Sequence, residues 1–294
     1  MRASLALVLL LFSPLGWADK PAETPFDDPV APESAEPVAG PATETMAPVV
    51  DDAVTTETTS PVSDNTPQIA PPTPFIAVYS ARISAARGET TMTLMPADDT
   101  RYRFHSATEA RGLARMLRSE PIVECSEFSM SRGGEWQAMT YTYRDGRKDS
   151  DIAFDFDRGV ATTRYRDESG VLDVPSKTTD RLLEQLLISR AIANDEALST
   201  RQVVDRGSLQ TIEWQFVGKE RVRVDAGSFE TVKYRRQREG SKRSSLIWFA
   251  PALDGLPVRI EQYRLDDRQA RAELKRYTDA ATIQARGTVT PVCP

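Results

Sequence analysis

The chain has 294 residues, of which 27% are charged, and its formal net charge at neutral pH is −6. This length allows one or two domains. Two cysteines and one histidine are too few for a zinc site built from those residue types, and we expect neither a metal nor another cofactor.

Residues 1–18 have the pattern of a secretory signal peptide. Arg2 supplies a positive charge, residues 5–12 are an apolar run, and Pro14 interrupts the chain before a small-residue sequence that ends at Ala18. The run is shorter than the roughly 20 residues that span a bilayer. We therefore expect cleavage after Ala18, a periplasmic location and a mature protein that is not integral to the membrane. The alternative is an uncleaved membrane anchor.

Residues 19–74 have the composition of a disordered, acidic, proline-rich linker. They contain 12 of the 20 prolines, 11 acidic residues and one lysine. Such a segment buries too little apolar surface to offset the entropy lost on ordering. Subtracting the linker's −10 and the leader's +1 from the total of −6 leaves +3 for residues 75–294. The expected globular domain is therefore mildly basic, and an exported domain with so small a charge is not expected to bind nucleic acid.

From residue 75 onward, apolar and polar residues alternate with the period of β-strands. Turn sequences separate these segments, for example at 132–134, 145–146 and 226–228. Short turns between successive strands favour an antiparallel meander over βαβ units. The expected strands are residues 75–83, 89–95, 102–106, 122–130, 135–144, 151–157, 160–166, 210–217, 220–224, 229–237, 244–249, 258–263 and 270–277.

One segment, residues 178–194, has helical spacing instead. Thr179 or Asp180 can cap its first turn, and its polar residues fall mostly off the apolar stripe. We expect an amphipathic helix that packs into a strongly curved antiparallel sheet or an incomplete barrel. The apolar stripe consists of Leu182, Leu183, Leu186, Leu187, Ala191 and Ile192.

Residues suited to catalysis are few. A Ser-His-Asp or Cys-His mechanism would have to use His105, the one histidine, which lies in an expected strand. Two carboxylates can hydrolyse glycosides when they face each other across about 5–10 Å. Asp151, Asp155 and Asp157 are close in sequence, but they are more simply the end of a strand and its turn. We predict no catalytic residues.

Basic residues gather between residues 219 and 243. If residues 220–224 and 229–237 form a hairpin, five cations are expected to share its outer face. This face suits an anionic polysaccharide, a lipid headgroup or the acidic linker. The alternative is a solvated face whose charges block edge pairing. The five cations are Lys219, Arg221, Arg223, Lys233 and Arg235.

The two cysteines, Cys125 and Cys293, are expected to form a disulfide in an oxidising compartment. This bridge would tie the C-terminal end of the chain to a strand near the middle of the domain. Free or intermolecular thiols are the alternative.

Several stretches of the sequence resemble a bacterial envelope family known as domain of unknown function three-one-zero-eight. The resemblance covers about residues 75–280 and includes the pattern Trp248-x-Ala250-Pro251 followed by Leu256-Pro257-Val258-Arg259-Ile260. The stretches are 74–80, 154–157 with the helix that follows, 223–233 and 246–260.

The resemblance implies a fold similar to the curved, incomplete barrels that carry lipoproteins between bacterial membranes. Such a sheet can hold an apolar ligand between itself and its helix, here under residues 183–192. The family has no assigned activity, so the resemblance implies no catalytic residue. The side chains expected to line the ligand pocket are Trp136, Tyr141, Leu183, Leu187 and Trp248.

We therefore expect a non-enzymatic periplasmic binding or carrier module for a lipid or another apolar or amphipathic ligand. This function predicts a deep pocket under the helix. One alternative is an envelope scaffolding protein that binds an anionic polymer or a protein partner, which predicts a filled barrel and a working basic face. The other is a carboxylate-based hydrolase, which predicts a polar cleft with two converging acids.

Overall fold

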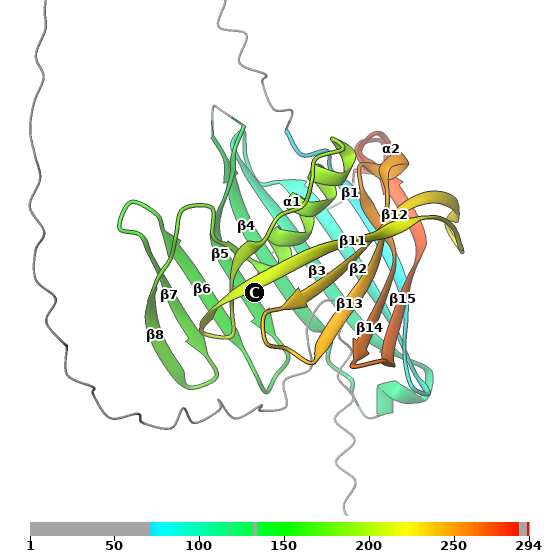
Figure 1. Cartoon of the computed structure of the whole chain (residues 1–294), viewed down its shortest axis with the longest axis horizontal. Helices are drawn as coiled ribbons and strands as arrows, with labels where there is room; N and C mark the ends of the chain where they lie inside the picture. Colours follow the sequence, from blue (N-terminus) through cyan, green and yellow to red (C-terminus); the bar gives the residue numbers. More distant parts are fainter. Residues whose placement is uncertain (1–70, 117, 132–133, 288–292, 294) are drawn as a thin grey trace, which may run out of the picture. The chain divides into compact units, whose positions relative to one another are not determined.

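A computed structural model describes residues 71–116, 118–131, 134–287 and 293. The expected signal peptide and all but the last four residues of the expected linker lie outside these residues. The described chain forms one sheet of 15 strands with a helix, α1, packed against one face (Figure 1). Strands β1 and β15 pair in the middle of the sheet, and the other strands follow outward from them in chain order.

The half of the sheet that leads outward from β1 ends at β8. Its elements are β1 (Phe75–Ile83), β2 (Ala86–Pro96), β3 (Arg101–Arg111), the 3₁₀ turn η1 (Gly112–Met116), β4 (Ile122–Met130), β5 (Trp136–Arg144), β6 (Ser150–Asp155), β7 (Val160–Tyr165) and β8 (Glu168–Asp173). Every pairing in this half is antiparallel.

The half that leads outward from β15 ends at β9. Its elements are β9 (Thr179–Asp180), α1 (Arg181–Ala193), β10 (Arg201–Asp205), β11 (Ser208–Val224), β12 (Gly227–Arg238), β13 (Arg243–Ala250), the 3₁₀ turn η2 (Pro251–Leu253), β14 (Leu256–Arg264), β15 (Asp267–Asp279) and α2 (Ala280–Arg286). Only the short β9 pairs in parallel, with β10.

The expected fold class is confirmed: a mainly β domain whose curved antiparallel sheet wraps a helix. The sheet curves until the turn between β10 and β11 approaches β7, because a Cβ added at Gly207 would lie 3.6 Å from Cβ of Tyr165. The two halves of the sheet therefore come close together on one side of the domain.

Three strands were not expected from the sequence, and two segments that were expected to be separate strands form a single strand. Strand β8 is almost wholly exposed, so it has no buried face to impose an alternating pattern. Strands β9 and β10 have only two and five residues. Residues 210–217 and 220–224 belong to the single strand β11, because an irregularity between Phe216 and Gly218 interrupts its alternation.

Helix α1 is buried on nearly every side, so the expectation of an amphipathic helix is wrong. Its polar residues Arg181, Glu184 and Gln185 are buried together with its leucines and isoleucines. The sequence shows the apolar stripe but not that strands of both halves of the sheet cover the opposite side. No helix in the described part of the chain is long and apolar enough to cross a membrane.

The turn before β14 presses directly against the backbone of α1. Gly255 has a φ of +70°, and a Cβ there would lie 1.9 Å from the carbonyl oxygen of Ser189. The Pro251–Gly255 turn, which the sequence predicts, is thus also a packing contact. Glycine is required there both for its backbone conformation and for its size.

We expect Gly255→Ala to lower the free energy of unfolding by about 3 kcal/mol, because the methyl group must displace the helix and the backbone is left-handed. The measurement is urea denaturation followed by tryptophan fluorescence. Gly240→Ala is the control, because Gly240 has a φ of +68° and open space around it. It should cost only about 1 kcal/mol, and equal losses in the two variants would refute the close contact.

Candidate ligand-binding site

The N-terminus of α1 is held by a buried aspartate. Asp180 accepts hydrogen bonds from the backbone N–H groups of Leu182 and Leu183 at 2.8 and 2.9 Å. Its second oxygen accepts one from the hydroxyl of Ser126 on β4 at 2.7 Å. Burial raises the pKa of Asp180 to about 6, although these hydrogen bonds oppose the rise. The predicted cap at this position is thus confirmed for Asp180.

The next residue, Arg181, joins the helix to both halves of the sheet. Its guanidinium lies 2.7 Å from a carboxylate oxygen of Glu124 on β4 and 3.9 Å from one of Asp205 on β10. Its Nε also donates to the hydroxyl of Tyr141 on β5 at 2.7 Å. The Arg181 side chain is 4% exposed. A buried cation needs such partners to offset the loss of its hydration.

One turn later, Glu184 connects the helix to the half of the sheet that leads outward from β15. Its carboxylate lies 2.6 Å from Nη2 of Arg236 on β12 and accepts a hydrogen bond of 3.0 Å from Nε1 of Trp214 on β11. Arg236 and Trp214 are opposite each other in the ladder, so their side chains share the face of the sheet that covers α1. We call this face the inner face.

Two of the expected ligand-binding residues belong to the filled interior. Leu183 is fully buried, and Tyr141 is 1% exposed. Burial raises the pKa of Tyr141 well above its usual value, so its hydroxyl is neutral and donates to Glu124 at 3.1 Å. Neither residue lines the pockets described below. The expected deep cavity directly under the helix is occupied by these side chains and their hydrogen bonds.

Trp248, a third expected residue, lies on the opposite face of the sheet from α1. In the sheet it lies directly opposite Lys233 on β12 and Arg259 on β14, and its indole N–H donates to Glu220 at 2.6 Å. The Lys233 ammonium lies 4.5 Å from the indole ring centre. Trp248 is thus covered by the β11–β12 hairpin, and the expectation that it lines a pocket under the helix is not met.

An open cavity does lie beside the C-terminal half of α1, at the ends of several strands. Its volume is about 190 Å³. We call it the apolar pocket, because most of its lining is hydrophobic. Its main apolar contributors are Phe75, Leu94, Trp136, Leu186, Leu256 and Tyr277.

A second cavity, of about 500 Å³, lies on the other side of the same half of α1. We call it the polar pocket, because its lining includes Glu135, Thr178, Arg190 and Arg201. Leu187 is one of its few apolar members. Of the expected ligand-binding residues, Trp136 lines both pockets and Leu187 lines the polar one.

The two pockets share Trp136 and Arg190. The Arg190 guanidinium lies 5.0 Å from the centre of the Trp136 ring, and one of its N–H groups donates to the carbonyl of Gly134 at 3.3 Å. No ion pair within the described residues involves Arg190, so a cation stands at the boundary between an apolar and a polar cavity. Sequence reasoning did not single out Arg190, because its role depends on the distant strand β5.

The five expected surface cations do not share one face. Strands β11 and β12 do form a hairpin, with Arg221 opposite Glu230 and Lys219 opposite Val232. Lys233 and Arg235 therefore lie on the other face from Lys219, Arg221 and Arg223. The register of the hairpin causes this separation, because Val224 pairs with Gly227 and odd-numbered residues of β11 beyond Gly218 therefore pair with even-numbered residues of β12.

Several other residues named from the sequence have structural partners. Cys125 and Cys293 form a disulfide with their Cα atoms 5.5 Å apart. Asp151 pairs with Arg144 and Arg164, and Asp155 accepts a hydrogen bond from the backbone of the turn that follows it. Burial lowers the pKa of His105, which lies within β3 opposite Cys125. These acids do not line the two pockets beside α1.

A family model described as "Protein of unknown function (DUF3108)" matches residues 76–275, well over half of the chain. No curated protein matches the sequence.

Three solved structures are similar to the chain at low identity. A beta-barrel-like protein of domain of unknown function DUF1849 from Brucella abortus is 11% identical, with 70% of this chain and 98% of that chain covered and a TM-score of 0.47. A protein titled "putative lipoprotein" from Parabacteroides distasonis is 12% identical (71% and 97% covered, TM-score 0.27). A protein titled "putative exported protein with YmcC-like fold" from Bacteroides fragilis is 13% identical (72% and 98% covered, TM-score 0.28).

We expect Arg236→Met to lower the free energy of unfolding by about 3 kcal/mol, because it leaves the buried carboxylate of Glu184 without its cation. The double variant Glu184→Met/Arg236→Met should recover most of this loss in chemical denaturation. Lys177→Met is the control, since the Lys177–Glu135 pair is 80% and 70% exposed and should cost under about 0.5 kcal/mol. A double variant no more stable than Arg236→Met would contradict the pairing.

Asp180 should make stability depend on pH. Its pKa is about 6 in the folded protein and 3.8 when unperturbed, so the folded state binds the proton more tightly and stability falls as pH rises from about 4 to about 6. Asp180→Asn keeps an oxygen for the cap but cannot ionise. Between pH 4.5 and 7 the wild type should lose about 2 kcal/mol relative to this variant, measured by denaturation at both pH values. A constant difference would argue against a buried carboxylate.

Proposed function

The chain belongs to the DUF3108 family, and we propose that its domain is a non-enzymatic binding or carrier module for an amphipathic ligand of the bacterial cell envelope. The observation that carries this proposal is the pair of pockets beside α1. One pocket has a mainly apolar lining, the lining of the other includes several charged and hydroxyl side chains, and they meet at Trp136 and Arg190.

The apolar pocket suits the hydrocarbon or ring portion of such a ligand. Phe75, Tyr277 and Trp136 supply aromatic surface around it. Burial of apolar ligand atoms against such side chains contributes about 25 cal/mol for each Å² removed from water. The filled interior under the helix leaves the ligand at the end of the sheet, so it can enter and leave without separating α1 from the strands.

The polar pocket suits the ligand's headgroup. Its volume of about 500 Å³ lies within the usual range for small-molecule sites. Arg190 at the boundary favours an anionic group next to the apolar portion, because a guanidinium donates charge-assisted hydrogen bonds to phosphate or carboxylate. A lipid or lipid-like molecule with an acidic headgroup satisfies both pockets.

We place this function in the periplasm. The leader-like residues 1–18 are typical of export, and the disulfide between Cys125 and Cys293 suits an oxidising compartment. A carrier that works there would exchange its ligand with membranes or partner proteins.

A second candidate function is an interaction or scaffolding role, and the β11–β12 hairpin favours it. Arg221 and Arg223 are exposed cations on one face of this hairpin, and Phe216 nearby is 53% exposed. Such a surface suits an anionic envelope polymer or a protein partner.

The decisive experiment is native mass spectrometry of the full chain, expressed with its own leader and purified from the periplasm without delipidation. We expect a stoichiometric extra mass that disappears on organic extraction. Ala193→Trp should abolish it, because Ala193 lines the apolar pocket at an exposed position and the indole can occupy that space. Leu113→Trp is the matched control, since Leu113 is 84% exposed in η1.

A wild-type spectrum without extra mass would exclude tight ligand binding and favour the scaffolding function. Equal ligand occupancy in Ala193→Trp and the wild type would show that the ligand binds elsewhere.

A further inference from the structure

Four arginines share the inner face of the sheet near one end of β12, β13 and β14. Arg236 pairs with Ser245 across β12 and β13, and Ser245 pairs with Gln262 across β13 and β14. Because every second residue of a strand points to the same face, Arg238 lies on this face two residues beyond Arg236. Arg243 and Arg264, which oppose each other, lie on it two residues from Ser245 and Gln262.

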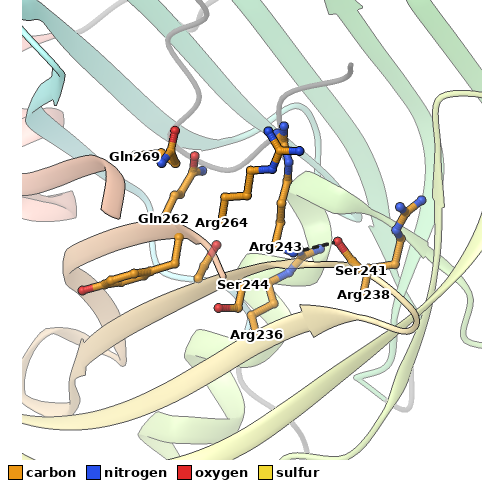
Figure 2. A pocket seen from close by; sticks show the side chains of 10 residues that line it. Arg236, Arg238, Ser241, Arg243, Ser244, Gln262, Arg264 and Gln269 are labelled. Atoms are coloured by element: carbon orange, nitrogen blue, oxygen red, sulfur yellow. Dashed lines mark hydrogen bonds between the residues drawn. The ribbon is translucent and has the colours of Figure 1, made fainter. Parts of the chain in front are cut away.

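These side chains surround a small cavity of about 50 Å³, which we call the arginine pocket (Figure 2). This volume exceeds the space of one water molecule and suits a small polyatomic ion. Neutral hydrogen-bonding groups complete the lining. They come from Ser241, Ser244, Ser245, Gln262, Tyr263 and Gln269.

The arginine pocket has cationic donors and no acidic side chain in its lining. Of the two β12 arginines that line the pocket, only Arg236 has an ion pair within the described residues, with Glu184 of α1. No ion pair among those residues involves Arg238 or Arg264. The Nε of Arg238 is buried and has no hydrogen-bond partner among them, although a buried N–H normally has one.

The arrangement of the donors indicates the class of ligand. Arginines from three neighbouring strands line one small cavity, with hydroxyl and amide groups between them. A carboxylate is satisfied by a single bidentate arginine, whereas a tetrahedral phosphate group has oxygens for several. The buried donor of Arg238 then gains an acceptor that the described residues do not supply.

We propose that the arginine pocket binds a phosphate-type oxyanion, either free or as the phosphate of a lipid headgroup. The pocket lies where β13 begins and β14 ends, whereas the apolar pocket adjoins the start of β14. The two sites are therefore at opposite ends of the same strands. The oxyanion site does not depend on the ligand proposed for the pockets beside α1.

The test is titration of the full chain, purified from the periplasm and dialysed, with inorganic phosphate in an isothermal calorimeter, with sodium chloride of equal ionic strength as reference. We expect saturable binding to phosphate only. Arg238→Gln/Arg264→Gln should weaken it by about tenfold or more, the effect of losing charge-assisted hydrogen bonds. Arg221→Gln/Arg223→Gln, which removes the same charge from the exposed hairpin, should leave it unchanged.

The single variant Arg264→Gln keeps the test valid if the double variant misfolds. Arg264 is exposed, so its replacement should leave the fold intact and still weaken binding. The absence of phosphate-specific heat, or equal weakening in the hairpin variant, would overturn the proposal.

Flotation with phosphatidylglycerol vesicles distinguishes the two sources of phosphate. Co-flotation that is lost in Arg238→Gln/Arg264→Gln but kept in Arg221→Gln/Arg223→Gln supports a lipid headgroup as the source. Phosphate binding without co-flotation supports a soluble phosphate compound.

Discussion

The fold depends on two buried charges of α1 that have partners in opposite halves of the sheet. Arg181 is paired with Glu124 on β4, and Glu184 is paired with Arg236 on β12. An unpaired charge in the interior costs several kcal/mol, so the helix is compatible only with a sheet whose two halves both reach it. A flat sheet would leave at least one of these charges without a partner. The pairs thus favour a strongly curved sheet over a flat one.

The same pairs determine where ligands can bind. They and the side chains around them fill the space between α1 and the strands, where sequence reasoning expected a cavity. The three cavities described above lie at the ends of the strands. At one end, aromatic and aliphatic side chains flank α1, and at the other, arginines of three strands gather around a small pocket. The two ends of the sheet therefore differ in chemistry, and the filled interior separates them.

Strands with one buried face were predictable, and strands without one were not. The expected strands at residues 75–83 and 122–130 have the bounds of β1 and β4, because alternation there reflects a real inner and outer face. Strand β8 lacks a buried face and has no such pattern. Of the five residues expected to line a ligand pocket, Trp136 and Leu187 line the cavities beside α1, whereas Tyr141, Leu183 and Trp248 do not. An aromatic or aliphatic residue looks the same in sequence whether a cavity or another side chain lies beside it.

The sequence by itself determined the β-rich class, the helix and the two candidates for its cap, the hairpin turn at Gly255 and the family, because these depend on local periodicity, turn chemistry and contiguous motifs. The tertiary structure decided which face each cation occupies, which side chains surround α1 and where the cavities remain. A one-residue irregularity near Gly218 changes the face of every later side chain in β11 relative to the earlier ones. Likewise, Arg236 and Glu184 are 52 residues apart and become partners only when the sheet curves around the helix. Such facts depend on register and packing between distant segments, which local patterns do not encode.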